Sequence, residues 1–307
     1  FEKKINLTSN NKLLPETELS FVVKEDLSQK KLADDGDPEA MYNLGYDYLN
    51  GEQVEESDYK KAFDLISHAA DKNLSSAMYL LSTMYLGGYG CEVDFASSKM
   101  WLIKSAEVGH YMAQYTLGTI LHPELNKREQ WDKLGFKEDE SLAIKWLTLA
   151  SEQGYPEAFL ALGRTFYNDS FFEDDKNQRF EHEKKARNFF VKGAELGNAD
   201  CQAILAKFHF DGIGKGKSLV GAATCALLAL GNGTNFEEET KSLLDEIKLD
   251  DDGWIKVYDI ISVAFFDGDV VGKNLNHCRF YTLESANLGS LEAQYRMGQL
   301  YDYGWGV

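Results

Sequence analysis

The chain has 307 residues and a formal charge of −18, from 50 acidic and 32 basic side chains, with 44% hydrophobic residues and only 4 prolines. This is the composition of a globular protein, and the length indicates two compact domains or one elongated array, because a single core stops growing at about 250–300 residues. The acidic charge argues against a nucleic-acid partner, since phosphate binding needs clustered Lys and Arg.

The N-terminal segment differs from the rest of the chain. Residues 1–18 are polar and include Pro15, which predicts a tail. From Leu19 to Gly36, apolar residues recur at helical spacing, which predicts a helix that either ends a preceding repeat or caps an array.

A helical pattern recurs along the remainder of the chain. Its first copy begins at Ala40, with Leu44, Gly45 and Tyr48 following at offsets four, five and eight on one helical face. Small residues at offsets zero and five let a neighbouring helix approach, and a glycine at offset eleven ends the helix. The starting positions, which we call pivots, lie near residues 40, 77, 113, 158, 201, 257 and 293, so the basic unit has 36 residues.

A second helix is predicted between each pair of pivots. In four of its five clear copies a glycine follows the helix, as Gly109 does. Asn73 takes this place in the first copy, and it suits the position because Asn tolerates the left-handed conformation.

No segment shows the period-two alternation of a strand, so the chain is predicted to be all-α. Helix pairs this short bury their apolar faces only by stacking, which predicts an α-solenoid of about seven helix-turn-helix repeats over 19–307. The layout is similar to that of right-handed tetratricopeptide superhelices. The Leu-Gly pair, the loop Gly88-Tyr89-Gly90 and the closing Ala-x-x-Gly resemble the Sel-one-like repeat family more closely, over 33–307. The resemblance is specific in repeats one to four and seven, and weak in five and six.

Three insertions lengthen the repeats, at 122–139, 168–183 and 231–252. Insertions in a repeat array are where individual function tends to be placed. Their aromatic residues either contact a partner or cover the core of the array: Trp131, Phe136, Phe171 and Phe172. The third insertion predicts an extra helix that fills the space between repeats five and six, with these residues on one face: Phe236, Thr240, Leu243, Leu244 and Ile247. Acidic runs in and beside the insertions favour a partner surface that is neutral or basic.

No catalytic, cofactor or metal motif is present. The segment 214–218 reads Gly-Lys-Gly-Lys-Ser, but a phosphate-binding loop needs a glycine where Asp211 stands and a strand before it. The six histidines lack metal-ligand spacing, and the four cysteines form no pair. The chain is therefore predicted to be no enzyme and to hold no cofactor.

In the resembling family, the first helix of each repeat lines a concave groove. This implies peptide contacts at offsets three and six from several pivots, and at offset seven in the fourth repeat: Asn43, Tyr46, Thr83, Thr116, Thr119, Thr165, Arg296 and Gln299. The tyrosines at offset two are attributed to packing between repeats.

The resemblance implies a non-enzymatic adaptor that binds other proteins. Four N-x-S/T sequons, expected in tail or loop positions, favour N-glycosylation and the secretory pathway: Asn6, Asn73, Asn168 and Asn232. The chain then resembles the lumenal adaptor of endoplasmic-reticulum-associated degradation, which recruits misfolded glycoproteins to a membrane ubiquitin ligase.

Two alternatives stay open. The first is a cytoplasmic scaffold of the same family, such as a cell-wall synthase activator or a bacterial host-interaction protein. The second is an enzyme related to cysteine-rich repeat proteins, although the paired cysteines of those proteins are missing. The most apolar run, 219–230, is too short to span a membrane. The chain begins without Met and stops within a repeat, so a longer protein is expected.

Overall fold

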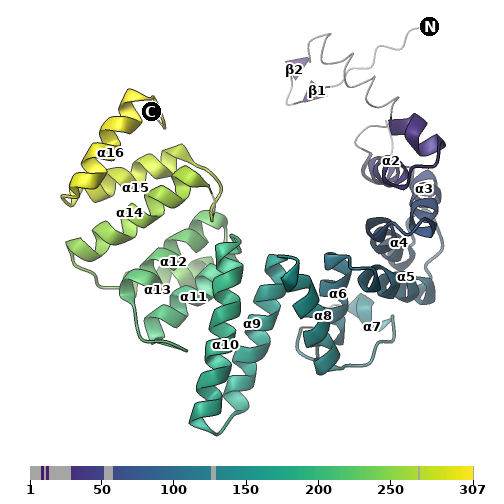
Figure 1. Ribbon diagram of the computed structural model, residues 1–307, viewed down its shortest axis with the longest axis horizontal. Coiled ribbons are helices and arrows are strands. Elements are labelled where there is room, and N and C mark those ends of the chain that lie inside the picture. The colour runs from purple at the N-terminus through teal and green to yellow at the C-terminus, as the bar shows by residue number, and fades with distance from the viewer. Residues whose placement is uncertain are drawn as a thin grey trace. The chain divides into compact units, whose positions relative to one another are not determined.

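The structure, a computed structural model, describes residues 8–9, 12–13, 29–51, 58–125, 129–268 and 270–306 (Figure 1). The chain divides into two compact units, Phe1–Asp139 and Glu140–Val307. Within the described ranges, no helix combines the length and the apolar content that crossing a bilayer requires.

The first unit is a series of helix pairs. Residues 29–34 are helical and are followed by Gly36 at φ 92°. The helices that come next are α2 (Pro38–Asn50), α3 (Tyr59–Asp71), α4 (Ser75–Gly87), α5 (Phe95–Glu107), α6 (Tyr111–Leu121) and the short α7 (Glu129–Asp132). Neighbours in sequence pack against each other from α2 to α6.

The second unit continues the same alternation with one extra helix. Its helices are α8 (Glu140–Glu152), α9 (Pro156–Phe172), α10 (Lys176–Glu195), α11 (Ala199–Asp211), α12 (Leu219–Asn232), α13 (Glu237–Glu246), α14 (Asp251–Asp267), α15 (Leu275–Asn287) and α16 (Leu291–Asp302). The predicted helical-repeat fold is confirmed, because six of the seven pivots lie in a helix that a second helix follows, and the seventh lies in α16, the last described helix.

A two-residue antiparallel ladder joins β1 (Thr8–Ser9) to β2 (Lys12–Leu13) within the predicted polar tail. Sequence periodicity could not indicate it, because two residues are too few to show alternation. The ladder adds no layer to the helical fold.

Helix starts follow from capping side chains. Asp37, Asp58 and Asp94 each accept a hydrogen bond from a backbone N–H in the first turn of the helix that follows. Helix ends follow from the left-handed residues: Asn73 has φ 65°, as the sequence predicts, and Gly109 has φ 99°. Such caps satisfy backbone groups that a helix leaves unpaired at its ends.

The side chains at the pivots belong to the hydrophobic core. All seven are buried, with no more than 2% of their surface exposed: Ala40, Ala77, Ala113, Ala158, Cys201, Val257 and Ala293. The small residue at offset five also does what the pattern predicts. A Cβ added to Gly163 would lie 2.5 Å from the Phe190 ring on α10, so the two helices approach closely because that position carries no side chain.

The insertion 122–139 folds back onto the first unit. Leu134 is buried and Trp131 is partly buried. The Lys99 ammonium on α5 lies 4.1 Å from the centre of the Phe136 ring and donates to the carbonyl of Gly135 at 3.0 Å. This insertion therefore covers its own unit.

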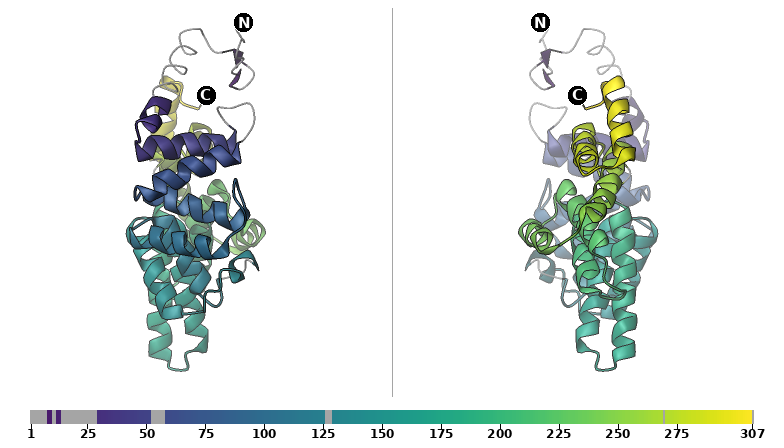
Figure 2. Two further views of the ribbon diagram at one scale, coloured as in Figure 1. Left: turned by 90° about the vertical axis from the view of Figure 1, so that its right-hand side faces the viewer. Right: turned by 90° about the vertical axis from the view of Figure 1, so that its left-hand side faces the viewer.

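The insertion 168–183 lengthens α9 and α10 instead of forming a loop. The α9–α10 hairpin extends past its neighbours in the second unit (Figure 2). Its turn follows Phe171 and Phe172, which are 64% and 82% exposed. Two large apolar side chains consequently stand in solvent at the end of this hairpin.

Candidate functional site

The third insertion places α13 beside α11 and α12. The carboxylate of Asp200 on α11 fixes the turn before α13. Its Oδ1 accepts hydrogen bonds from the Thr234 hydroxyl at 2.9 Å and from the Asn235 N–H at 2.8 Å, and its Oδ2 accepts one from Asn235 Nδ2 at 2.9 Å. Burial raises the pKa of Asp200, but the bonds from Asn235 and Thr234 outweigh burial and hold this pKa below its usual value.

The apolar face of α13 holds the helix to the unit. Thr240, Leu243 and Ile247 are buried, on the face that the sequence predicts. Leu243 and Ile247 join a core cluster that also contains residues of α11, α12 and α14. The helix is thus fixed at its start by Asp200 and along its length by apolar packing.

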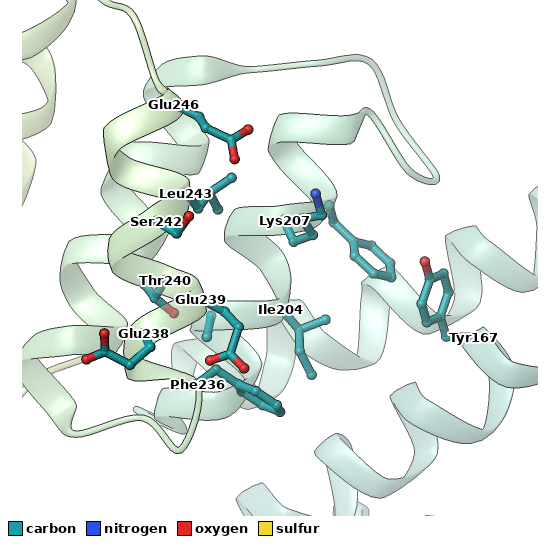
Figure 3. A pocket seen from close by; sticks show the side chains of 12 residues that line it. Tyr167, Ile204, Lys207, Phe236, Glu238, Glu239, Thr240, Ser242, Leu243 and Glu246 are labelled. Atoms are coloured by element: carbon teal, nitrogen blue, oxygen red, sulfur yellow. The ribbon is translucent and has the colours of Figure 1, made fainter.

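A cavity of about 700 Å³ lies between α13, α11 and the end of α9 (Figure 3). This volume is within the range of pockets that bind ligands. The lining residues are Tyr167 from α9, Ala203, Ile204, Lys207 and Phe208 from α11, and Phe236, Glu238, Glu239, Thr240, Ser242, Leu243 and Glu246 from α13 and its cap.

Aromatic rings form one side of the cavity. Tyr167 packs on Phe208, with ring centres 4.8 Å apart. It also packs on Phe171, again with 4.8 Å between the ring centres. The apolar surface therefore continues from the cavity to an exposed residue of the α9–α10 hairpin. Burial raises the pKa of Tyr167, and Glu183 and Asp211 raise it further, so its hydroxyl stays protonated at neutral pH.

More acidic than basic side chains line the cavity. Glu239 and Glu246 on α13 point toward the cavity, and Glu238 also belongs to its lining (Figure 3). Lys207 is the basic residue of the lining, and its ammonium is 3.2 Å from the Asp211 carboxylate. The cavity thus has an apolar side and an acidic side.

A buried cation lies elsewhere in the second unit. Arg187 on α10 is only 8% exposed, and its Nη2 donates to Nε2 of His209 on α11 at 3.1 Å. Burial lowers the pKa of His209, and Arg187 and Lys215 lower it further, to about 4. His209 is therefore neutral and accepts the hydrogen bond. No group of three His, Cys, Asp or Glu side chains in the described part of the chain is arranged to hold a metal ion.

The predicted groove residues do not gather at this cavity, and two of them are not on the surface. Thr116 is 6% exposed and lies 3.4 Å from the Tyr79 hydroxyl, while Thr165 is 2% exposed and donates to the Ala161 carbonyl at 3.1 Å. The expectation of peptide contact is wrong at both, because neighbouring packing covers them.

The other groove residues are at least partly accessible. Asn43, Tyr46 and Gln299 are exposed, and Thr83 and Thr119 are half-buried. Arg296 Nη1 donates to the Ser262 hydroxyl at 2.9 Å, so this side chain is held within its own unit. Their contact with a peptide stays a prediction.

The sequons lie in different settings. Asn6 is outside the described residues, and Asn73 is exposed just after α3. The expectation of a loop is wrong for Asn168, which lies within α9, and for Asn232, the last residue of α12. Asn232 Nδ2 donates to the Val270 carbonyl at 2.9 Å and to Gln202 Oε1 at 3.0 Å, so its amide nitrogen is already engaged.

Most residues of the cavity escaped the sequence analysis. Tyr167, Ile204, Lys207 and Glu239 carry no motif, and they come together only when α13 folds back on α11. The available signal was the insertion itself, whose amphipathic face predicted a packed helix. Glu239 and Glu246, which flank this apolar face on α13, form the acidic side of the cavity.

Five segments of the chain match the family model of the Sel1 repeat, at residues 38–74, 75–110, 132–155, 261–290 and 291–307. The stretch between the third and fourth matches, 156–260, contains α9 to α13. The cavity therefore lies where this chain departs from the repeat.

One solved structure shows the same fold, and two others are less similar. The Sel1 repeat protein from Oxalobacter formigenes is 24% identical with a TM-score of 0.55, over 82% of this chain and 88% of that chain. A putative Sel1 repeat protein from Klebsiella pneumoniae is 17% identical with a TM-score of 0.40, over 72% of this chain and 97% of that chain. A protective antigen of uropathogenic Escherichia coli with an SLR fold is 20% identical with a TM-score of 0.31, over 91% and 83%.

Proposed function

From the Sel1 repeats that this chain carries, we propose that it is a non-enzymatic scaffold that binds segments of other proteins in the cavity beside α13. Proteins built from Sel1 repeats generally act as scaffolds for protein–protein interaction and are not typically enzymes. Stacked helix pairs offer an extended surface, and an insertion on that surface is a means of making one protein's binding specific.

The single observation that carries this proposal is the cavity of about 700 Å³, which has an apolar side and lies outside the matched repeats. A concave site with apolar walls and a few polar groups is the usual form of a binding pocket. Its position on helices, not on loops, keeps the walls in place for a partner.

The test is a selection of random peptides displayed on phage against the full chain. Selected peptides are then measured on the variant Ile204→Glu, which places a carboxylate among the lining residues, and on Ile260→Glu. Ile260 is 49% exposed on α14 and is not among the lining residues, so it undergoes the same chemical change away from the cavity.

The proposal expects binding to be lost in Ile204→Glu and kept in Ile260→Glu, with both variants folded by circular dichroism. Failure to select any peptide, or equal binding by both variants, would overturn it.

The finer assignment, an adaptor of degradation in the endoplasmic-reticulum lumen, is supported by the exposed sequon at Asn73. It predicts that the native protein shifts to higher gel mobility after treatment with an N-glycosidase, and that the variant Asn73→Gln loses part of this shift. An unshifted band would instead favour the alternative of a cytoplasmic scaffold.

A further inference from the structure

We propose that the cavity beside α13 takes a cationic peptide segment, in which one large apolar side chain stands between two Lys or Arg residues about 10 Å apart. This inference rests on the proposed function, because it names the chemistry of the segment that the scaffold binds. Three observations support it: the positions of the acids of α13, the ion pairs that neutralise some of these acids, and the apolar wall formed by α9 and α11.

Two acidic side chains that face the cavity lie on the same side of α13. Glu239 and Glu246 both point into it from α13, and Ser242 lies between them (Figure 3). Residues seven apart share one face of a helix, with a separation of about 10 Å at 1.5 Å per residue. That distance corresponds to about three residues of an extended peptide.

The lysine of α13 leaves these two acids unneutralised. Lys241 pairs with Glu237 and Glu238. Lys207 on the opposite wall pairs with Asp211. Among the residues that the structure describes, neither Glu239 nor Glu246 makes an ion pair, so the cavity keeps two carboxylates that a cationic partner could neutralise.

The wall opposite α13 is apolar. Ile204 and Tyr167 stand across the cavity from the acids, and the Phe236 ring closes one end (Figure 3). The Arg164 guanidinium lies 5.7 Å from the centre of the Phe236 ring, and in the described part of the chain it forms no ion pair with either acid. An aromatic or branched aliphatic side chain would displace water from this wall, while flanking cations reach the carboxylates.

The test measures the affinity of the full chain for three labelled peptides with blocked termini by fluorescence anisotropy. The first carries Lys-Trp-Ser-Lys between glycines, the second Glu-Trp-Ser-Glu and the third Lys-Gly-Ser-Lys. The first is expected to bind at least about fivefold more tightly than either of the others, because only it supplies both the charge and the apolar side chain.

Two double variants identify the acids that act. Glu239→Gln with Glu246→Gln should weaken the first peptide about fivefold, a loss typical of two partly exposed ion pairs. Glu237→Gln with Asp245→Asn removes the same charge from residues of α13 that do not line the cavity, and should weaken binding by less than about twofold. All four side chains are exposed, so neither variant is expected to unfold the helix.

Each result separates the two proposals. Equal weakening in both double variants would show that only the general charge of the chain acts, and it would overturn this inference. Preference for the second peptide, or for an uncharged peptide from the phage selection, would overturn it while leaving the scaffold function intact if Ile204→Glu still abolishes binding. Absence of any binding peptide would overturn both.

Discussion

At the scale of single residues, the position of α13 depends on Asp200. Its carboxylate replaces water for three donors in the turn before the helix, and two of them belong to Asn235. Hydrogen bonds to a charged acceptor are stronger than those between neutral groups. The acidic side of the cavity is therefore positioned by a residue that does not line it.

Replacing this carboxylate should loosen α13. Asp200→Ala is expected to lower the free energy of unfolding by about 1–2 kcal/mol, because three donors lose a shared acceptor that is partly solvated. Urea unfolding gives the energy, and hydrogen exchange should quicken over 234–246.

The control is Asp211→Ala, which removes the exposed ion pair with Lys207 and should cost less than about 1 kcal/mol. Equal effects of the two substitutions, or unchanged exchange in α13, would contradict the role given to Asp200.

His209 makes the second unit sensitive to acid. Its folded-state pKa is about 4 against an ordinary value of 6.5, so the unfolded chain binds the extra proton first as the pH falls. Stability is then fully present above about pH 6.5 and decreases toward the folded-state pKa, by about 1–2 kcal/mol once solvent screening of the half-buried ring is allowed for.

The variant His209→Gln keeps an acceptor for Arg187 and removes the titration. Urea unfolding at about pH 7 and about pH 5 should show a smaller loss of stability in the variant than in the wild type. A loss of the same size in both proteins would exclude His209 as its source.

At the scale of the helices, one repeat position has different surroundings in different copies. Offset five is Gly163 in α9 and Gly298 in α16. A Cβ at Gly163 would lie 2.5 Å from Phe190, whereas one at Gly298 has no described atom within 4 Å.

Alanine at these two glycines should change stability in opposite directions. Gly163→Ala is expected to cost about 1–3 kcal/mol, because the buried Phe190 ring has to move. Gly298→Ala should gain up to about 1 kcal/mol from helix propensity. Urea unfolding of both variants checks the pair, and a loss at both sites would mean that the close approach at Gly163 is not the cause.

The helices were predictable from sequence because their signals are local. Burial repeats at 3.6 residues per turn, and caps such as Asp37 and Asn73 act on the turn beside them. The repeat pattern gives no sign that the insertion 168–183 extends α9 and α10 instead of forming a loop. Asn168 was therefore expected in a loop, whereas it lies within α9. Whether Thr116 faces solvent was not predictable either, since a neighbouring helix decides it.

At the scale of the whole molecule, the charge of −18 acts on partners at a distance. An acidic surface raises the rate at which cationic segments meet it and lowers the rate for anionic ones. Glu239 and Glu246 then act at short range, where the affinity depends on the positions of the charges and not on the net charge of the chain.

Salt should separate these two contributions. Raising NaCl from about 50 to about 500 mM shortens the screening length several-fold and should slow association of the Lys-Trp-Ser-Lys peptide more than it speeds dissociation. Stopped-flow anisotropy measures both rates, with an uncharged peptide as the control. An association rate that does not change with salt would argue against long-range attraction.

The sequence by itself determined the repeat, because small pivots, terminal glycines and polar caps each act within one or two turns of helix. It also determined that the segment 231–252 would pack one face of a helix against the array. Only the tertiary structure decided what the acids beside that face meet. Glu239 on α13, Ile204 on α11 and Tyr167 on α9 are far apart along the chain, and the Asp200 carboxylate brings α13 to the other two. Such contacts depend on the path of the backbone between repeats, and no periodicity within a repeat encodes it.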